Sequence, residues 1–329
     1  MKYYFAPMEG ITGYCFRQVH HKFFPGLDAY YTPFIAANKT LSFSGREKKE
    51  FDPLNNKDIP TVPQLMGNDA GAFLFAAGEM AGRGYGEINF NLGCPASTVV
   101  SHHRGAGMLA DTERLDAFFD EVFEGLEKHP LPAVISVKTR IGMTDPDELP
   151  AILDVYEKYP IAKLIVHPRV RSEFYSGEVH EDAFAYVLER ARCPVVYNGD
   201  IRSMQDIRRI AALFPEAEGI MCGRGLLIDP AMLRGLCGEE DAAGQSSGAL
   251  VRKFHNELIS TYLREYGDEA QTLSKMKEII YWLGQGYENS DKLVTRMRHS
   301  KDLPEYRMYA EKMFSGCAYK IKKTGPDDE

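Results

Sequence analysis

The segment 91–110, NLGCPASTVVSHHRGAGMLA, places a cysteine where it could take part in chemistry. Cys94 lies between a glycine and a proline, directly after the short apolar run EINFN, which is typical of a buried strand. A free cysteine has a pKa of about 8.5, so its thiol is mostly protonated at neutral pH and can donate a proton without an activating base. The alternative is a small buried hydrophobe, which we expect for Cys222 because it lies inside an apolar run.

Lys138 ends the apolar run AVISVK, and a lysine at the end of a buried strand is costly unless an anion accompanies it. Three interpretations remain open. A reduced flavin carries negative charge near N1 and O2, where a lysine would tune its electronics. A lysine in such a position can also form a Schiff base with a carbonyl substrate, or a structural salt bridge.

Eight short apolar runs, rich in β-branched or aromatic residues, predict the strands that would position these side chains. They are residues 3–7, 29–33, 61–65, 87–91, 133–138, 163–167, 194–198 and 219–223. Helical patterns at 68–81, 111–126 and 203–214 lie between them, and the last begins with Ser203, an N-cap residue. Strands that alternate with helices predict a parallel sheet, and eight such units predict an α/β fold of the (β/α)8 TIM-barrel type. An open, doubly wound sheet is the alternative, although no GxGxxG follows the first run.

In such a barrel, functional side chains lie at the carboxyl ends of the strands. Besides Cys94, the residues at or after those ends are Pro7, Met8, Gln64, Asn91, Lys138, Arg140, His167, Arg169, Arg171, Asn198, Asp200, Gly223 and Arg224. The loops after the seventh and eighth strands of this fold commonly bind phosphate through backbone amides. Gly199 and Gly223 would let the backbone approach a phosphate closely, and Arg224 could pair with it. The sequence thus favours a phosphate-bearing cofactor, with ordinary tight turns as the alternative.

The sequence after the predicted barrel changes in character. Residues 237–249, CGEEDAAGQSSGA, are typical of a linker, and a purely helical pattern follows them. We therefore predict a barrel domain over 1–240 and a smaller all-helical domain over 241–329. The formal net charge is −8, yet residues 275–323 contain 11 Lys or Arg and 6 Asp or Glu. This local positive excess suggests either a nucleic-acid contact or a solvated helical surface.

Several classes of protein are disfavoured. No apolar run is long enough to cross a bilayer and the N-terminal one is too short for a signal peptide, so we expect a cytoplasmic protein. The six cysteines form no CxxC pair, which argues against a zinc site. The pairs His20-His21 and His102-His103 lack a third ligand at recognisable spacing, so we expect surface residues and no metal. By default we expect a monomer with no stable protein partner.

The ordered motifs resemble those of the tRNA-dihydrouridine synthases. From residue 5 to about residue 230 the chain contains, in order, APMEGIT, QLMGND, NFNLGCP followed by GAGML, SVKTRIG, LIVHPRVRSEFYSG, YNGDI and GIMCGRG. The resemblance implies a barrel enzyme that binds FMN and uses NADPH to reduce specific uridines in tRNA to 5,6-dihydrouridine. It also implies that the helical C-terminal domain helps to hold the tRNA.

The same resemblance assigns roles by position. Cys94 would be the catalytic acid, Asn91 would lie beside the uracil, and Arg169 and Arg171 would contact the substrate or a tRNA phosphate. The residues assigned to the flavin ring are Pro7, Met8, Gln64, Lys138 and His167, and those assigned to its ribityl phosphate end are Asn198, Asp200, Gly223 and Arg224. His167 is placed near the substrate as well.

One departure from the family pattern concerns the segment that contains His167. Family members usually have His-Gly-Arg where this chain has His167-Pro168-Arg169, and proline removes an amide donor and fixes φ. In the C-terminal domain, the basic residues expected to contact tRNA phosphates are Lys292, Arg296, Arg298, Lys301 and Arg307. Binding through them should weaken with added salt.

In the implied reaction, the Cys94 thiol would act as the proton donor. Uracil contains a conjugated enone, so hydride from flavin N5 should add to C6, and the resulting enolate then needs a proton at C5. A loop after the fourth strand can place the Cys94 thiol there, and the turn 105–107 would let this loop fold back. Because the target uridine lies within folded RNA, it must be extruded before it can react.

Two other functions remain as alternatives. Another FMN barrel, such as a dihydroorotate or enoate reductase, would share the phosphate site but would not need a basic helical domain. A tRNA-binding protein with a decayed barrel should have lost the acid or the flavin contacts first. The chain retains these residues, namely Cys94, Lys138, His167, Asn198 and Arg224.

Overall fold

A computed structural model describes residues 1–234, 236 and 246–320. These residues form two units. The first consists of Met1–Gln18 and Leu27–Gly223, and the second of Val19–Gly26 and the described residues from Arg224 onward. Residues 237–245, which include most of the predicted linker and the predicted domain boundary at 240, lie outside the described part of the chain. The boundary therefore stays a prediction.

The first unit is built on parallel strands. Within the described residues these are β1 (Lys2–Phe5), β2 (Ala29–Tyr31), β3 (Ile35–Ala36), β4 (Thr61–Val62), β5 (Gln64–Met66), β6 (Glu87–Leu92), β7 (Val134–Arg140), β8 (Leu164–His167), β9 (Val195–Tyr197) and β10 (Gly219–Cys222). Their order in the sheet is β3-β5-β6-β7-β8-β9-β10-β1-β2-β4. Each of the eight predicted runs coincides with one strand or with an interrupted pair of strands.

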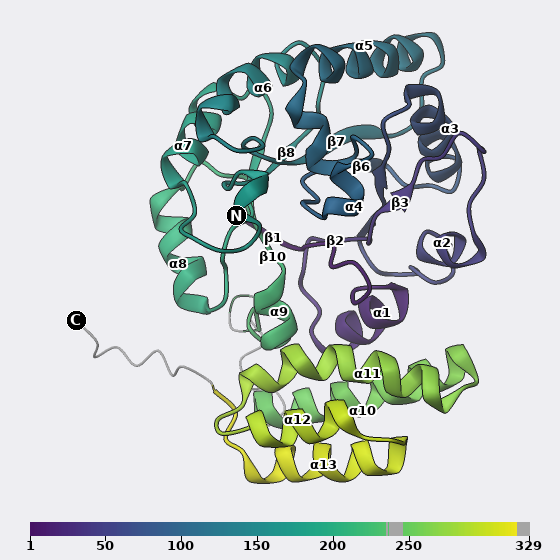
Figure 1. The fold of residues 1–329 in the computed structure, drawn as a ribbon, viewed down its shortest axis with the longest axis vertical. Coiled ribbons are helices and arrows are strands. Elements are labelled where there is room, and N and C mark those ends of the chain that lie inside the picture. The colour runs from purple at the N-terminus through teal and green to yellow at the C-terminus, as the bar shows by residue number, and fades with distance from the viewer. Residues whose placement is uncertain (235, 237–245, 321–329) are drawn as a thin grey trace. The chain divides into compact units, whose positions relative to one another are not determined.

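The sheet closes on itself through Pro63. β4 and β5 are one segment interrupted at this proline, and they pair with β2 and β3 respectively. Because proline has no amide hydrogen, the ladder is bridged there by a side chain: Gln64 N donates to Thr32 Oγ1 at 3.0 Å. The two ends of the strand order are thereby joined. In Figure 1, β6, β7 and β8 lie inside an arc of helices formed by α3, α5, α6, α7 and α8. The predicted TIM-barrel-like fold is confirmed, and the open-sheet alternative is wrong.

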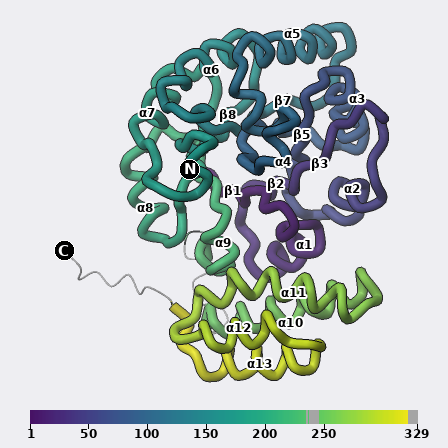
Figure 2. Tube along the Cα trace, in the orientation of Figure 1, coloured from purple at the N-terminus to yellow at the C-terminus, as the bar shows by residue number. Residues whose placement is uncertain are grey.

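Helices cover the outside of the strands, as the Cα trace also shows for α3, α5, α6, α7 and α8 (Figure 2). In the first unit and at its border the helices are α1 (Tyr14–Phe23), α2 (Gly45–Glu50), α3 (Ala70–Ala81), α4 (Ser97–Val100), α5 (Thr112–Lys128), α6 (Leu149–Tyr156), α7 (Glu181–Arg190) and α8 (Met204–Leu213). Short 3-10 helices span Gly105–Ala110, Pro146–Glu148 and Arg171–Glu173. The predicted N-cap Ser203 is present, because its side chain accepts from Asp206 N. The Asp111 side chain caps α5 in the same way by accepting from Arg114 N.

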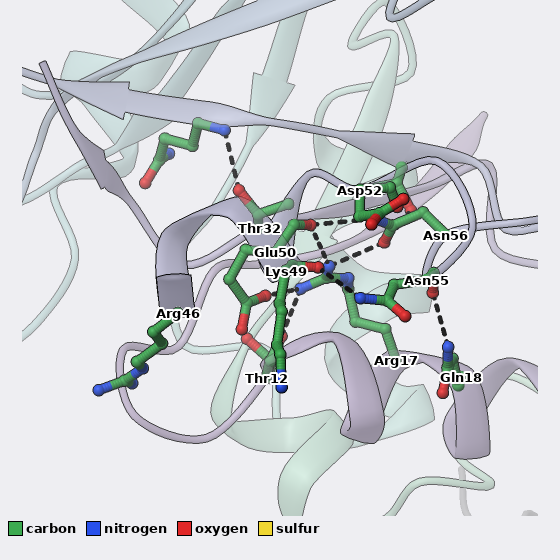
Figure 3. A network of polar contacts seen from close by, with 12 residues as sticks. Thr12, Arg17, Gln18, Thr32, Arg46, Lys49, Glu50, Asp52, Asn55 and Asn56 are labelled. Atoms are coloured by element: carbon green, nitrogen blue, oxygen red, sulfur yellow. Dashed lines mark hydrogen bonds and ion pairs between the residues drawn. The ribbon is translucent and has the colours of Figure 1, made fainter. Parts of the chain in front are cut away.

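A buried arginine joins α1 to the end of α2 and to the chain that follows it (Figure 3). Arg17 Nη1 donates to Thr12 O at 2.9 Å and to Glu50 Oε2 at 2.8 Å. Its Nη2 donates to Glu50 O at 2.9 Å and to Asn56 Oδ1 at 2.8 Å. These bonds offset the cost of burying a guanidinium and fix the long connection between β3 and β4.

The second unit is helical, as predicted for the C-terminal region. Its helices within the described residues are α9 (Arg224–Ile228), α10 (Ser247–Tyr266), α11 (Glu269–Leu283), α12 (Asp291–His299) and α13 (Leu303–Gly316), with a 3-10 turn at Gly284–Gly286. Helix α10 begins two residues before the predicted end of the linker, because the Ser246 side chain caps it by accepting from Ala249 N. No helix in the described residues is long and apolar enough to cross a membrane.

One of the predicted surface histidines is buried. His20 is 1% exposed and packs against Phe24 and Phe254, with ring centroids 5.4 and 6.1 Å apart. Burial lowers the pKa of His20 to about 3, so it is neutral in the folded protein. The expectation of a surface residue was wrong for His20 because its apolar neighbour Phe254 comes from a distant part of the sequence. His102 and His103 are exposed, as predicted.

Candidate active site

Asn91 fixes the backbone that carries Cys94. It lies near the end of β6, and its Oδ1 accepts hydrogen bonds from Gly93 N at 3.1 Å and Cys94 N at 2.9 Å. Its Nδ2 donates to Gln64 Oε1 at 2.8 Å, so the orientation of the Asn91 amide is defined at both ends. Asn91 therefore positions the loop after β6, in addition to the substrate contact that the resemblance implied.

The chain of amides continues into the barrel. Gln64 Nε2 donates to Asn89 Oδ1 at 2.7 Å, and Asn89 Nδ2 donates to Ser136 Oγ at 2.8 Å. Gln64, Asn89 and Ser136 are fully buried. Our sequence reasoning missed Asn89 and Ser136. The sequence contained a signal for Asn89: it lies two residues before Asn91 in the predicted strand, so the two side chains point to the same face of the sheet.

Two arginines also hold the Cys94 loop. Arg140 Nε donates to Gly93 O at 3.0 Å. Arg171 Nε donates to Pro95 O at 3.1 Å and its Nη2 donates to Ser97 Oγ at 3.1 Å. The predicted contact of Arg171 with the substrate or a phosphate stays a prediction, and in the structure its side chain binds this loop.

The Gly-Ala-Gly segment packs directly on the cysteine. Ala106 N donates to Cys94 O at 3.1 Å. Gly105 has φ +54°, and a Cβ at this position would lie 3.0 Å from both Cys94 Cβ and Cys94 O. A Cβ on Gly107 would lie 2.8 Å from Val100 O. The expected fold-back of residues 105–107 is present, and glycine is required there by close approach.

The surroundings of Cys94 keep its thiol protonated. Burial raises the pKa of Cys94, and the negative charge of Glu9 acts in the same direction, while the Ala96 amide, Lys138 and Arg140 oppose the shift. Because the net shift is upward, the thiol form dominates at neutral pH. This is the state required of a proton donor.

Lys138 is a partly buried cation without an anionic partner. It pairs with Asn91 in the β6–β7 ladder and lies on the same strand face as Ser136. Burial, reinforced by the positive charge of Arg140, lowers the pKa of Lys138 to about 7. No described residue forms a hydrogen bond or ion pair with its Nζ. The strand continues two residues beyond the predicted end, so Lys138 lies inside β7 rather than at its terminus.

Arg169 and Asp200 form a bidentate ion pair. Arg169 is completely buried; its Nη1 donates to Asp200 Oδ1 at 3.0 Å and its Nη2 to Asp200 Oδ2 at 2.7 Å. The same guanidinium lies 3.3 Å from His167 Nε2 and donates to Gly177 O at 2.6 Å. The structure thus brings together three predicted site residues, and Arg169 neutralises the carboxylate that was assigned to the phosphate end.

The loops after β1, β9 and β10 adjoin one another. Asn198 Nδ2 donates to Met221 O at 2.8 Å, which ties the end of β9 to β10. A Cβ on Gly223 would lie 3.3 Å from Met8 Sδ, so the loop containing Pro7 and Met8 reaches the end of β10. Arg224 is the first residue of α9 and belongs to the second unit.

Residues 4–315 match the family described as "Dihydrouridine synthase (Dus)". The chain belongs to the dihydrouridine synthase family. A probable tRNA-dihydrouridine synthase from Rickettsia conorii is 29% identical, over 87% of this chain and 85% of that protein. A tRNA-dihydrouridine(16) synthase from Ralstonia nicotianae is 29% identical, over 68% of this chain and 69% of its own length.

Solved structures bear out the fold. Morphinone reductase has a TM-score of 0.51 at 10% identity, over 73% of this chain and 86% of its own. An old yellow enzyme homologue from Zymomonas mobilis also has a TM-score of 0.51 at 10% identity, over 72% of this chain and 88% of its own. The family expected from the motifs is confirmed, and membership in the dihydrouridine synthases makes the chain a flavin-dependent oxidoreductase.

The site residues fit a flavin. In a dihydrouridine synthase, an unpartnered lysine inside the barrel suits the anionic edge of a reduced flavin. Among the described residues, no group of three or more His, Cys, Asp or Glu side chains could hold a metal ion. The arrangement therefore combines a place for a redox cofactor with a protonated thiol held in a fixed loop.

Proposed function

We propose that this dihydrouridine synthase reduces uridine in tRNA to 5,6-dihydrouridine, with FMN as its bound cofactor and NADPH as its reductant. One observation carries the proposal: a thiol with a raised pKa is fixed by Asn91, Arg140 and Arg171 beside a lysine that lacks an anion. The names of the relatives support the tRNA substrate.

The chain's own residues supply the proton. When bound, the flavin supplies the hydride that C6 of the uracil accepts. The Sγ–H bond of Cys94 breaks, and its proton forms the new C–H bond at C5 of the enolate. One hydride and one proton then account for the two hydrogens gained. Cys94 is partly exposed, so water can return a proton to the thiolate that remains.

The cofactor contacts stay as we assigned them. Lys138 would neutralise the anionic edge of the flavin ring, with Gln64 also at the ring. The remaining contacts proposed for the ring are Pro7, Met8 and His167, and those proposed for the phosphate end are Asn198, Asp200, Gly223 and Arg224. The Arg169–Asp200 pair supports this assignment, because it prevents an unpaired carboxylate from repelling a phosphate.

The proposed tRNA contacts in the second unit lie on α12, on α13 and between them. All five are exposed, as phosphate contacts must be: Lys292, Arg296, Arg298, Lys301 and Arg307. Relatives from Ralstonia nicotianae, Neisseria meningitidis and Pseudomonas putida are named as tRNA-dihydrouridine(16) synthases. We therefore propose nucleotide 16 as the target.

Mass spectrometry of nucleosides from unmodified tRNA, incubated with the protein, FMN and NADPH, tests the proposal. We expect a gain of two hydrogens on uridine, located at nucleotide 16 by nuclease mapping, and none when FMN or NADPH is withheld. NADPH oxidation by a flavin-loaded protein that leaves tRNA unchanged would instead favour a small-molecule flavin reductase.

A further inference from the structure

The loop between β8 and α7 exposes two aromatic side chains close to the Cys94 loop. Phe174 is 41% exposed and Tyr175 is 51% exposed, a few residues after His167 at the carboxyl end of β8. Adjacent aromatic rings with this exposure are costly in water and commonly mark a binding surface.

The backbone at Phe174 is held in a strained conformation. Its φ is +51° and its ψ is −99°, a region that bulky L-residues rarely adopt. Arg140 Nη2 donates to Phe174 O at 2.6 Å and its Nη1 donates to Val170 O at 2.9 Å. The same guanidinium also binds Gly93 O. One buried arginine therefore fixes Phe174 relative to the Cys94 loop, and maintained strain of this kind is typical of functional sites.

Guanidinium groups lie against both rings. Arg171 Cζ is 4.9 Å from the centroid of Phe174, and Arg140 Cζ is 5.4 Å from that of Tyr175. The ring of Tyr175 is also stacked near His167, with centroids 6.0 Å apart and planes 29° apart. Exposed rings interleaved with arginine are the groups with which proteins stack unpaired bases of RNA.

We propose that Phe174, supported by Arg171, stacks on an unpaired base next to the uridine that is reduced. This inference rests on the proposed function, because it takes tRNA as the substrate. Extruding the uridine breaks its stacking with its neighbours. A ring fixed beside the Cys94 loop can replace that lost contact, and it would hold the strand while Cys94 reaches C5.

Fluorescence of an introduced indole tests the contact directly. The chain has one tryptophan, Trp282, so Trp282→Phe provides a silent background. In that background, Phe174→Trp should be quenched when the FMN-loaded protein binds unmodified tRNA, since stacking on a base quenches indole emission. Tyr186→Trp is the matched control, because Arg190 Cζ lies 5.6 Å from that ring on α7. We expect little quenching there.

Affinity measurements in the native background provide a second test. Phe174→Leu should raise the Kd for tRNA roughly 5- to 150-fold, the loss for one stacked base, and Phe174→Tyr should restore it. The slope of log Kd against log salt should stay unchanged in Phe174→Leu, because no phosphate contact is removed.

Three results would overturn the inference. They are equal quenching at the two indole positions, no quenching at position 174 with tRNA bound, and a Kd for Phe174→Leu within about twofold of the wild type. The mass-spectrometry assay of the proposed function separates the two failures. If one of these three results is obtained while wild-type protein forms dihydrouridine in that assay, the stacking role fails and the proposed function stands. If wild-type protein forms no dihydrouridine, both fail.

Discussion

Replacing Lys138 with methionine should stabilise the flavin-free protein. Burial and Arg140 lower the pKa of Lys138 from 10.5 to about 7, which means that the folded state disfavours the ammonium form. A displacement of this size corresponds to about 4 kcal/mol of destabilisation at neutral pH. Methionine has similar length and no charge, so Lys138→Met removes this cost while it keeps the packing.

The destabilisation by Lys138 depends on pH, and the lowered pKa sets the direction of that dependence. Between its folded pKa and its unfolded pKa, Lys138 binds fewer protons in the folded state than in the unfolded state. The cost is therefore full below about pH 7, decreases to about 1 kcal/mol near pH 9.5, and vanishes above the unfolded pKa. The advantage of Lys138→Met over the wild type should shrink along the same course.

Urea unfolding of the apoprotein, followed by circular dichroism at about pH 7 and about pH 9.5, measures this difference. Lys163→Met is the matched control, because Lys163 Nζ donates to Glu87 Oε2 at 2.9 Å. Removing that partnered lysine should destabilise the protein by about 1–3 kcal/mol. A Lys138→Met apoprotein that is less stable than wild type, or whose advantage does not change with pH, would refute the reasoning. The same variant should bind FMN about tenfold more weakly or worse.

Three further changes follow from the structure. Gly105→Ala should destabilise the protein by about 1–3 kcal/mol and slow uridine reduction, because the position has positive φ and a Cβ would lie 3.0 Å or less from its neighbours; wild-type rates would contradict this. Arg17→Met should cost about 3 kcal/mol in urea unfolding by leaving the Glu50 carboxylate without its partner, and a loss below about 1 kcal/mol would contradict the network. Replacing both Arg296 and Arg298 with glutamine should lower the salt slope of tRNA binding by about 2, and an unchanged slope would place the phosphate contacts elsewhere.

Local sequence signals predicted most of the barrel. Apolar runs located the strands, and side-chain caps such as Ser203 located the helix starts, because both depend on neighbouring residues. The two-residue strand β3 was missed because it is short and follows Pro33. The end of β7 was misplaced because Thr139 and Arg140 are polar. Arg140 is nevertheless buried, since it donates to carbonyl groups that come from other loops.

Partners that are distant in the sequence explain what could not be predicted at the site. The position of Cys94 after a strand was visible, but the bond from Asn91 to Gln64 spans 27 residues. The Arg169–Asp200 pair spans 31 residues. Nothing local shows that these side chains meet, so sequence reasoning named the residues but not the contacts that orient them.

The central claim is that Cys94 donates the proton to uracil. Single-turnover reduction of unmodified tRNA by FMN-loaded, pre-reduced protein tests it most directly, with dihydrouridine measured by mass spectrometry. Cys193→Ala is the matched control, because Cys193 is also a partly exposed free cysteine whose pKa burial raises, to about 11. We predict that Cys94→Ala slows the reaction by about 100-fold or more, while Cys193→Ala leaves it near the wild-type rate. A Cys94→Ala protein that binds tRNA and FMN normally and reduces uridine at the wild-type rate would contradict the account.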